Sequence, residues 1–197
     1  MSSPDGAKPE RLFIGVPLTP DARAAIVRVM PKALPGKLVA AEKWHFTLRF
    51  LGPTSREARD TIIARLSSVT LGSAFKIRFG ELGAFPNPRR ARVLWLGVTR
   101  GGERLSDLAA IAEDAARSAG FAAEGRGFTP HLTLSRIDPA QNITALLAQN
   151  HSYAIETTIT ALILYRSRLG GGPARYEEAA RFDLSNAGLS GGRDSSS

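Results

Sequence analysis

The 197-residue sequence predicts an α+β fold, a duplicated two-lobed arrangement in which antiparallel sheets flank a central cleft and helices lie on the outside. Short runs of apolar and β-branched residues indicate strands, and segments with helical periodicity separate them. The tetrapeptide pattern H-x-T-L occurs twice, opening at His45 and at His131, which are 86 residues apart. A motif repeated at that spacing indicates two related half-domains of about 90 residues.

The chain begins with an expected strand over residues 11–16, the apolar run RLFIGV. Thr19 and Pro20 then start a helix, as its N-cap and its first-turn proline. The first H-x-T-L motif falls in an expected strand over residues 44–51, because this run is rich in Phe, Leu and Thr.

Breaker and capping residues follow this strand. Gly52 and Pro53 are expected to end it, since neither residue favours the interior of a strand. Thr54 and Glu57 have the spacing of a capping box, so a second helix is expected to begin at Thr54.

The second half of the chain alternates in the same way. A helix is expected over residues 103–119, with Gly120 as its C-terminal stop. The second H-x-T-L motif lies in a strand that follows this helix. The strands expected in this half cover residues 75–82, 93–98, 129–136, 153–166 and 175–184.

Composition narrows the class of protein. With 43% hydrophobic and 22% charged residues the chain is of ordinary globular type. Its net charge of +8 indicates a polyanionic partner, since solubility alone needs no such sign bias. The absence of cysteine excludes disulfides, thiol nucleophiles and thiolate metal sites. No run approaches the ~20 apolar residues of a membrane helix, so we expect a cytoplasmic protein without membrane contact. We also expect it to be a monomer.

The same patterns divide the chain into three parts. Residues 1–10 are polar with two prolines and are expected to be a flexible N-terminus. Residues 11–184 are expected to form a single domain of two pseudo-symmetric lobes. Residues 185–197 are mostly Gly, Ser and charged residues and are expected to be a disordered tail.

The spacing within each motif predicts its chemistry. Residues two apart in a strand share a face, so His45 and Thr47 should point together, as should His131 and Thr133. An imidazole can give or take a proton near neutral pH, and a hydroxyl can hydrogen-bond an anionic oxygen. Two such pairs facing each other would hold an anion between a proton donor and a proton acceptor.

These residues resemble the two-histidine (2H) phosphoesterase superfamily, and within it the bacterial and archaeal RNA 2′,3′-cyclic phosphodiesterases, also called 2′-5′ RNA ligases. The resemblance includes both motifs with their flanks, WHFTLRFLG and FTPHLTLSR. It extends to RLFIGVPL near the N-terminus, FPNPRRARVLWLGV in the middle and LYRSRL late in the chain. It covers about residues 11–184.

The resemblance implies hydrolysis of an RNA-terminal 2′,3′-cyclic phosphate to a 2′-phosphate, without a metal or other cofactor. By this resemblance His45 is the proton donor, His131 is the proton acceptor, and Thr47 and Thr133 bind the phosphate. It also implies reversible 2′-5′ ligation and an RNA partner, with tRNA-derived ends among the candidates.

Two other kinds of function remain open. Another 2H activity, either nucleotide-sugar cyclic phosphate hydrolysis or trimming of RNA 3′ ends, would use the same histidines. A non-catalytic RNA-binding module would keep the basic cleft, although it gives no reason for two intact His–Thr pairs.

Several further residues are candidates for RNA contacts. Arg49 should share the face of His45 by strand parity, and there it could meet the RNA backbone. Arg136 lies five residues beyond His131, so parity turns it away from the site unless the strand bulges or ends near Ser135.

The remaining candidates are loop arginines and aromatic residues. Arg89 and Arg90 lie in a proline-rich loop and could track phosphates. Phe128 and Trp44 flank the histidines and could stack a base, but core packing is favoured for both. His151 lacks a threonine two residues later and is expected at the surface.

Overall fold

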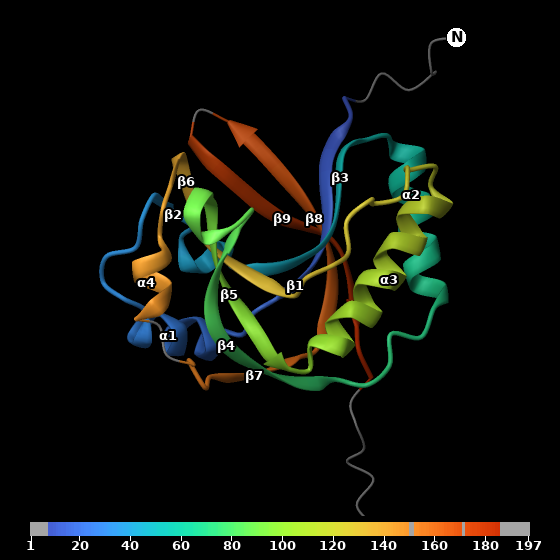
Figure 1. Ribbon diagram of the computed structural model, residues 1–197. Helices are drawn as coiled ribbons and strands as arrows, with labels where there is room; N and C mark the ends of the chain where they lie inside the picture. Colours follow the sequence, from blue (N-terminus) through green and yellow to red (C-terminus); the bar gives the residue numbers. More distant parts are fainter. Residues whose placement is uncertain (1–7, 150–151, 171, 186–197) are drawn as a thin grey trace, which may run out of the picture.

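A computed structural model of the chain describes residues 8–149, 152–170 and 172–185 (Figure 1). Its strands form one antiparallel, curled sheet in the order β7-β4-β5-β6-β3-β1-β8-β9, and β2 pairs separately with β6. The α+β class and the antiparallel pairing are therefore as predicted. The two expected sheets are halves of one sheet, joined where β3 meets β6 through the single residue pair Phe46–Leu132.

The bounds of the elements follow from the backbone. The strands are β1 (Glu10–Pro17), β2 (Lys37–Leu38), β3 (His45–Thr54), β4 (Phe75–Phe85), β5 (Ala91–Arg100), β6 (His131–Gln141), β7 (Glu156–Ile159), β8 (Ala161–Gly170) and β9 (Gly172–Asp183). The helices are α1 (Pro20–Val29), α2 (Arg56–Ser68), α3 (Gly102–Ser118) and α4 (Thr144–Ala148), with short 3₁₀ turns η1 (Ala41–Lys43) and η2 (Pro88–Arg90).

The two halves are built in the same order. In each, a strand is followed by a helix and then by the H-x-T-L strand, which pairs back antiparallel to the first: β1-α1-β3 and β5-α3-β6. β8 extends the first half beside β1, and β4 extends the second beside β5. The motif strands are thus the inner strands of both halves, which brings the two motifs together.

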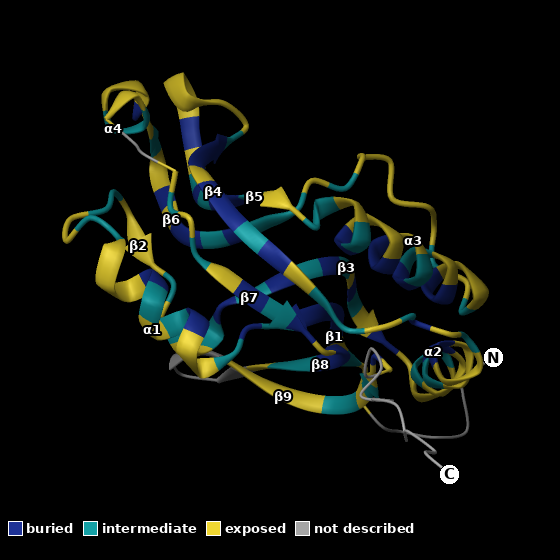
Figure 2. Cartoon of the chain, turned by 90° about the horizontal axis from the view of Figure 1, so that it is seen from below, coloured by how far each residue is buried: buried dark blue, intermediate teal, exposed yellow. Residues whose placement is uncertain are grey.

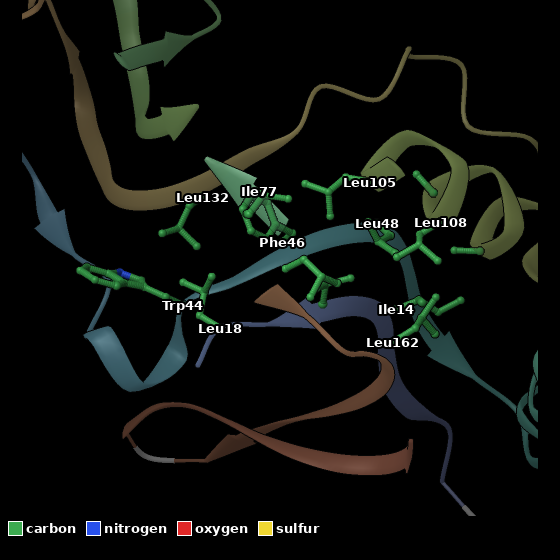
Figure 3. Packing of buried hydrophobic residues seen from close by; sticks show 14 of the residues in the cluster. Ile14, Leu18, Trp44, Phe46, Leu48, Ile77, Leu105, Leu108, Leu132 and Leu162 are labelled. Carbon is green, nitrogen blue, oxygen red and sulfur yellow. The ribbon is translucent and has the colours of Figure 1, made fainter. Parts of the chain in front are cut away.

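One large hydrophobic cluster lies beneath the motif strands. Phe46 and Leu132, the second residues of the two motifs, are fully buried and point into it. Leu48 lies in the same cluster together with Leu105 and Leu108 of α3 (Figure 3). Helices α2 and α3 pack side by side, at the opposite end of the molecule from α1 and α4 (Figures 1 and 2). Burial of the alternate apolar residues therefore fixes which face of each motif strand remains open.

The helix caps agree with the sequence in one case and differ in another. Thr19 caps α1, its hydroxyl accepting from the backbone N–H of Ala22, as predicted. The predicted cap of α2 at Thr54 is wrong, because Thr54 is the last residue of β3. Ser55 caps the helix instead, accepting from the N–H of Ala58.

Strand ends also differ from the sequence prediction. Gly52 and Pro53 do not end β3, which continues to Thr54 against β1. The strand expected over residues 153–166 is two strands that separate at Thr160: β7, at one edge of the sheet beside β4, and β8, in the other half between β1 and β9. The short elements β2 and α4 had no signal in the sequence.

Some predictions concern residues that the structure does not describe. His151 lies outside the described residues, and so does the proposed disordered tail apart from Ser185. Of the proposed flexible N-terminus, only residues 8–10 are described. None of the helices in the described part of the chain combines the length and apolar character needed to cross a membrane.

Candidate active site

The meeting point of β3 and β6 sets the arrangement of the two motifs. Phe46 and Leu132 pair directly and both point into the core. Side chains on either side of an antiparallel pair point to the opposite face, and there they lie across from one another. This register places His45 across from Thr133 and Thr47 across from His131. The four side chains are therefore expected together on the face opposite the core, and all four line one cleft.

His45 is held through both ring nitrogens. Its Nδ1 donates a hydrogen bond to the carbonyl oxygen of Lys43 at 2.7 Å. A carbonyl only accepts, so Nδ1 carries a proton and Nε2 of the neutral ring is left as an acceptor. The Thr47 hydroxyl donates to this Nε2 at 3.0 Å, within the same motif. The predicted pairing of imidazole and hydroxyl on one strand face is therefore present.

His131 is oriented by an equivalent contact. Its Nδ1 donates to the carbonyl oxygen of Thr129 at 2.7 Å, again the residue two positions earlier. The ring of Phe85 stands edge-on to the imidazole, with centroids 4.9 Å apart. The same tautomer therefore results, and Nε2 of the neutral ring is an acceptor.

Both imidazoles favour the neutral form in the free protein. Burial, together with the positive charges of Arg136 and Arg23, lowers the pKa of His45 to about 4. Burial also lowers the pKa of His131, with Arg136 again contributing. Because Arg136 acts on both rings, its positive charge would also attract an anion placed between them.

The site opens into a cleft with a volume of about 1290 Å³. His45, Thr47, His131 and Thr133 all line it. Its basic lining residues are Arg11, Lys43, Arg49, Arg92, Arg126 and Arg136. The cleft is therefore large enough for a nucleotide and carries the charge expected for a phosphate ligand.

A β-bulge follows each motif threonine. Along β6, Thr133 pairs with Trp95 and Ser135 pairs with Leu94, so Leu134 has no partner on β5. Along β3, Leu48 is skipped in the same way between Thr47 and Arg49. An extra residue in one strand reverses the facing of everything after it. Beyond Leu48 in β3 and Leu134 in β6, each side chain therefore points to the face opposite to the one that simple alternation from the histidine predicts.

The bulge in β6 brings Arg136 to the site. Arg136 pairs with Val93, which shares a strand face with Trp95 and hence with Thr133. The side chain accordingly lines the cleft and acts electrostatically on both histidines. The sequence placed Arg136 at the site only if β6 bulged or ended near Ser135, and the structure has this bulge.

The bulge in β3 has the opposite effect on Arg49. Arg49 pairs with the buried Ile14, so it lies on the other face of β3 from His45, and the parity prediction for Arg49 is wrong. Its guanidinium borders the cavity but is engaged by carboxylates, with Nε 2.6 Å from Glu113 and Nη1 3.5 Å from Glu124.

The other candidates fall into two groups. Arg89 and Arg90 belong to η2 and are exposed, but they do not line the cleft. Phe128 lines the cleft and also packs against the core, while Trp44 is 8% exposed and belongs to the core, as favoured.

Sequence reasoning missed three aromatic residues beside His45. Phe13, Phe50 and Tyr176 all line the cleft. The Phe13 ring lies 4.8 Å from the imidazole and the Tyr176 ring 5.3 Å. Phe50 lies in the segment WHFTLRFLG around the first motif, and the bulge at Leu48 turns it toward the site. A bulge assumed at Leu48 would have identified Phe50 from the sequence.

In the described part of the chain, no three histidine, aspartate or glutamate side chains come close enough together to hold a metal ion.

Comparison with known proteins places the chain in a family. Residues 17–171 match the family model of the 2′-5′ RNA ligase superfamily. An RNA 2′,3′-cyclic phosphodiesterase of Aeropyrum pernix is 41% identical over 114 residues, which are 58% of this chain and 64% of that relative. The Escherichia coli RNA 2′,3′-cyclic phosphodiesterase is 31% identical over 90% of this chain and 98% of its own length.

Solved structures show the same fold. The crystal structure of E. coli LigT in apo form has a TM-score of 0.78 at 27% identity, covering 91% of this chain and all of that one. E. coli LigT complexed with phosphate has a TM-score of 0.75 at 26% identity, with 91% of this chain covered. The family match spans both motifs and the E. coli relative covers 90% of this chain, so the chain belongs to the 2′-5′ RNA ligase superfamily of two-histidine phosphoesterases.

Proposed function

We propose that this protein hydrolyses the 2′,3′-cyclic phosphate at the end of an RNA to a 2′-phosphate, by acid–base catalysis between His45 and His131. The observation that carries the proposal is the pair of His–Thr units facing one another across β3 and β6, in a basic cleft. Relatives with RNA 2′,3′-cyclic phosphodiesterase activity in their names support it.

In the proposed reaction each histidine moves one proton through Nε2. Nε2 of His131 takes a proton from a water as its oxygen bonds to phosphorus. The bond from phosphorus to the 3′ oxygen breaks, and Nε2 of His45 gives its proton to that oxygen. The products are a 2′-phosphomonoester and a free 3′ hydroxyl. In both rings the Nδ1–H bond to a backbone carbonyl leaves Nε2 as the nitrogen that exchanges the proton, and substrate would take the place of the Thr47 hydroxyl at Nε2 of His45.

The phosphate itself would be held by the remaining cleft groups. Thr47 and Thr133 can each donate a hydroxyl to a non-bridging oxygen, and Arg136 adds a positive charge on the same face. Donors positioned where negative charge develops stabilise the transition state more than the ground state.

His45 would gain its proton when the substrate binds. Burial and nearby arginines lower the pKa of His45 in the free protein, so the ring is neutral at pH 7. A cyclic phosphodiester is a monoanion, and an anion beside Nε2 favours the imidazolium. Binding of substrate is therefore expected to take up a proton, which then becomes the one donated to the 3′ oxygen.

Replacing either histidine tests the proposal. His45→Ala and His131→Ala should each reduce turnover of a cyclic-ended RNA oligomer at least about a hundredfold, the scale of general acid–base catalysis. Turnover by the unmodified protein should be insensitive to EDTA. Full activity in either variant would overturn the proposal.

A sulfur substitution separates the two roles. When sulfur replaces the 3′ bridging oxygen of the substrate, the leaving group is a thiolate, which needs no proton from an acid. This substrate should restore turnover to His45→Ala but not to His131→Ala. The reverse rescue pattern would exchange the two assignments.

We further propose that the described cleft belongs to one domain of two lobes, which acts as a monomer in the cytoplasm, with tRNA-derived ends among its substrates. Formation of 2′-5′ linkages is the reverse reaction, in which a nucleoside hydroxyl replaces water and the two histidines exchange roles. Gel filtration at working concentration tests the oligomeric state.

A further inference from the structure

The second motif is preceded by a segment without regular structure. Residues 122–129 lie between α3 and β6 and contribute Glu124, Arg126 and Thr129 to the lining of the cleft. In the described part of the chain, no backbone–backbone hydrogen bond involves any residue of this segment. Its last residue nevertheless supplies the carbonyl that accepts from Nδ1 of His131. The orientation of this imidazole therefore depends on the side-chain contacts that hold the segment.

Arg49 supplies several of these contacts. Its side chain reaches from β3 to the segment, where Nη2 donates to the carbonyl oxygen of Ala122 at 2.5 Å. Nη1 lies 3.5 Å from a carboxylate oxygen of Glu124. Nη1 also donates to the carbonyl oxygen of Phe50 at 2.8 Å, which ties the guanidinium to the backbone of its own strand. Arg49 thus links β3 to the segment before the second motif.

Glu113 of α3 joins both partners. Its Oε2 lies 2.6 Å from Nε of Arg49, and its Oε1 accepts a hydrogen bond from the backbone N–H of Glu124 at 3.1 Å. We call Arg49, Glu113 and Glu124 the clasp. The side chain of Arg49 is 10% exposed and that of Glu113 is 27% exposed, so solvent and salt screen their ion pair only weakly.

The clasp connects the two halves of the sheet where the backbone does not. β3 and β6 pair directly only through Phe46–Leu132. Beyond the second motif, β2 ties β6 to the first half by pairing with Ser135 and Arg136. Ahead of that motif, the clasp ties α3 and residues 122–129 to β3. His131 therefore lies between one backbone connection and one connection made by side chains.

Without the clasp the segment would keep little to hold it. Phe128 packs against the core, but it is flanked by Gly127 and lies close to Gly125 in sequence. A Cβ added at either glycine would meet no atom within 4 Å, so the surroundings do not confine the backbone there. Glycine backbones are also the least restricted by their own structure. The Thr129 carbonyl would then be free to turn away from the imidazole.

We propose that Arg49 is a positioning residue for His131: through the clasp it holds residues 122–129, and with them the Thr129 carbonyl that keeps the proton of His131 on Nδ1. This inference rests on the proposed function for the role of His131 as the base. An imidazole that carries its proton on Nε2 cannot take one from water at that nitrogen. The partner that fixes the tautomer therefore supports the chemical step without touching the substrate.

Kinetics of an Arg49 variant test this role. Arg49→Met removes the guanidinium and keeps an unbranched side chain. Its kcat for adenosine 2′,3′-cyclic phosphate should fall about tenfold to a hundredfold, the scale for a misplaced catalytic group, while KM stays within about twofold. Arg49→Lys keeps a cation for Glu113 and should retain more of the kcat. A raised KM with unchanged kcat would mean that Arg49 binds the substrate directly, and would overturn the proposal.

A double-mutant cycle tests whether Arg49 acts through Glu113. Arg49→Met combined with Glu113→Gln should lose no more kcat than Arg49→Met alone, because both changes break the same contact. Losses that multiply would show independent effects and would overturn the clasp.

The matched control breaks another ion pair of the same helix. Arg65 of α2 pairs with Asp114, the residue after Glu113, at 2.7 Å, and neither residue lines the cleft. Arg65→Met should leave kcat unchanged. A loss as large as that of Arg49→Met would overturn the specific role of Arg49, because any ion pair on α3 would then have the same effect.

The ring nitrogens give a readout that needs no turnover. In protein labelled with nitrogen-15 histidine, the NMR shifts of His131 above pH 7 should report the Nδ1–H tautomer. In Arg49→Met they should move toward a mixture of both tautomers. His45 is the internal reference, because its Nδ1 donates to Lys43, outside the clasp, and its shifts should stay the same.

This spectrum separates a failed clasp from a failed reaction. If the unmodified protein does not hydrolyse the cyclic phosphate, the proposed function fails, and a change confined to His131 still supports the clasp. Unchanged His131 shifts in Arg49→Met, or equal changes in both histidines, would overturn the clasp and leave the hydrolysis standing.

Discussion

The imidazoles of this site are fixed before any ligand arrives. His45 and His131 each donate from Nδ1 to the carbonyl oxygen two residues earlier, at 2.7 Å in both cases. This contact selects the tautomer and aims Nε2 at the cleft. The shared faces of His–Thr pairs could be predicted from strand parity. The carbonyl contacts could not, since the direction of a carbonyl depends on the backbone turn before the strand rather than on residue identity.

The depressed pKa of His45 predicts a pH-dependent stability. Its pKa is about 4 in the folded protein, against an ordinary value of 6.5. Between these values the unfolded chain binds more protons, so the free energy of unfolding should fall as pH is lowered from about 6.5 to 4. The His45 share of this loss is at most about 3 kcal/mol, from 1.36 kcal/mol per pKa unit.

Urea unfolding of the protein and of His45→Asn, followed across pH 4–7, measures that share. The asparagine amide can still donate to the Lys43 carbonyl, but it does not titrate in this range. The variant should show a flatter dependence on pH. Parallel curves for the two proteins would contradict the assigned pKa.

At the scale of the elements, the β-bulges decide which side chains reach the site. Most of the longer strands could be predicted from their apolar alternation, and so could the four motif residues, whereas β2 and the division between β7 and β8 could not. The facing of Arg49 and Arg136 could not, because Leu48 and Leu134 are ordinary strand residues. A bulge is set by the register that the neighbouring strands β1 and β5 impose.

Gly15 shows how closely β1 approaches the first bulge. It pairs with Thr47, and a Cβ added to Gly15 would lie 2.7 Å from the Phe46 carbonyl oxygen and 3.4 Å from Cδ2 of His45. Gly15→Ala should therefore push the motif strand away. We expect a loss of about 1–3 kcal/mol in stability, as for overpacking, and up to about a hundredfold in kcat, as for a catalytic group displaced by an ångström.

Thermal unfolding and steady-state kinetics of Gly15→Ala measure these two losses. Gly125→Ala is the matched control, because a Cβ added there meets no atom within 4 Å. It should leave both stability and kcat unchanged. Wild-type kcat in Gly15→Ala would show that β3 yields without moving His45.

Over the whole molecule, two sheet halves meet through the single pair Phe46–Leu132 and leave an open cleft along their junction. The net charge of +8 predicted a polyanionic partner but gave no position for it. The fold distributes that charge unevenly. Arg49 is engaged by Glu113 and Glu124, whereas Arg126 lines the cleft exposed and has no carboxylate partner among the described residues. Which arginines face the cleft depends on ion pairs between residues distant in sequence.

This distribution predicts a salt dependence that grows with the length of the RNA. Affinity for a single-stranded oligomer should fall with log[KCl] with a slope of about −0.7 per phosphate contact, because each contact releases a counterion. A cyclic mononucleotide should show a smaller slope. Arg126→Gln should reduce the oligomer slope by about 0.7. Arg89→Gln, on η2 outside the cleft, should leave it unchanged. Fluorescence anisotropy of a labelled oligomer from 50 to 300 mM KCl measures all three, and an equal effect of both substitutions would mean that RNA binds across η2 rather than along the cleft.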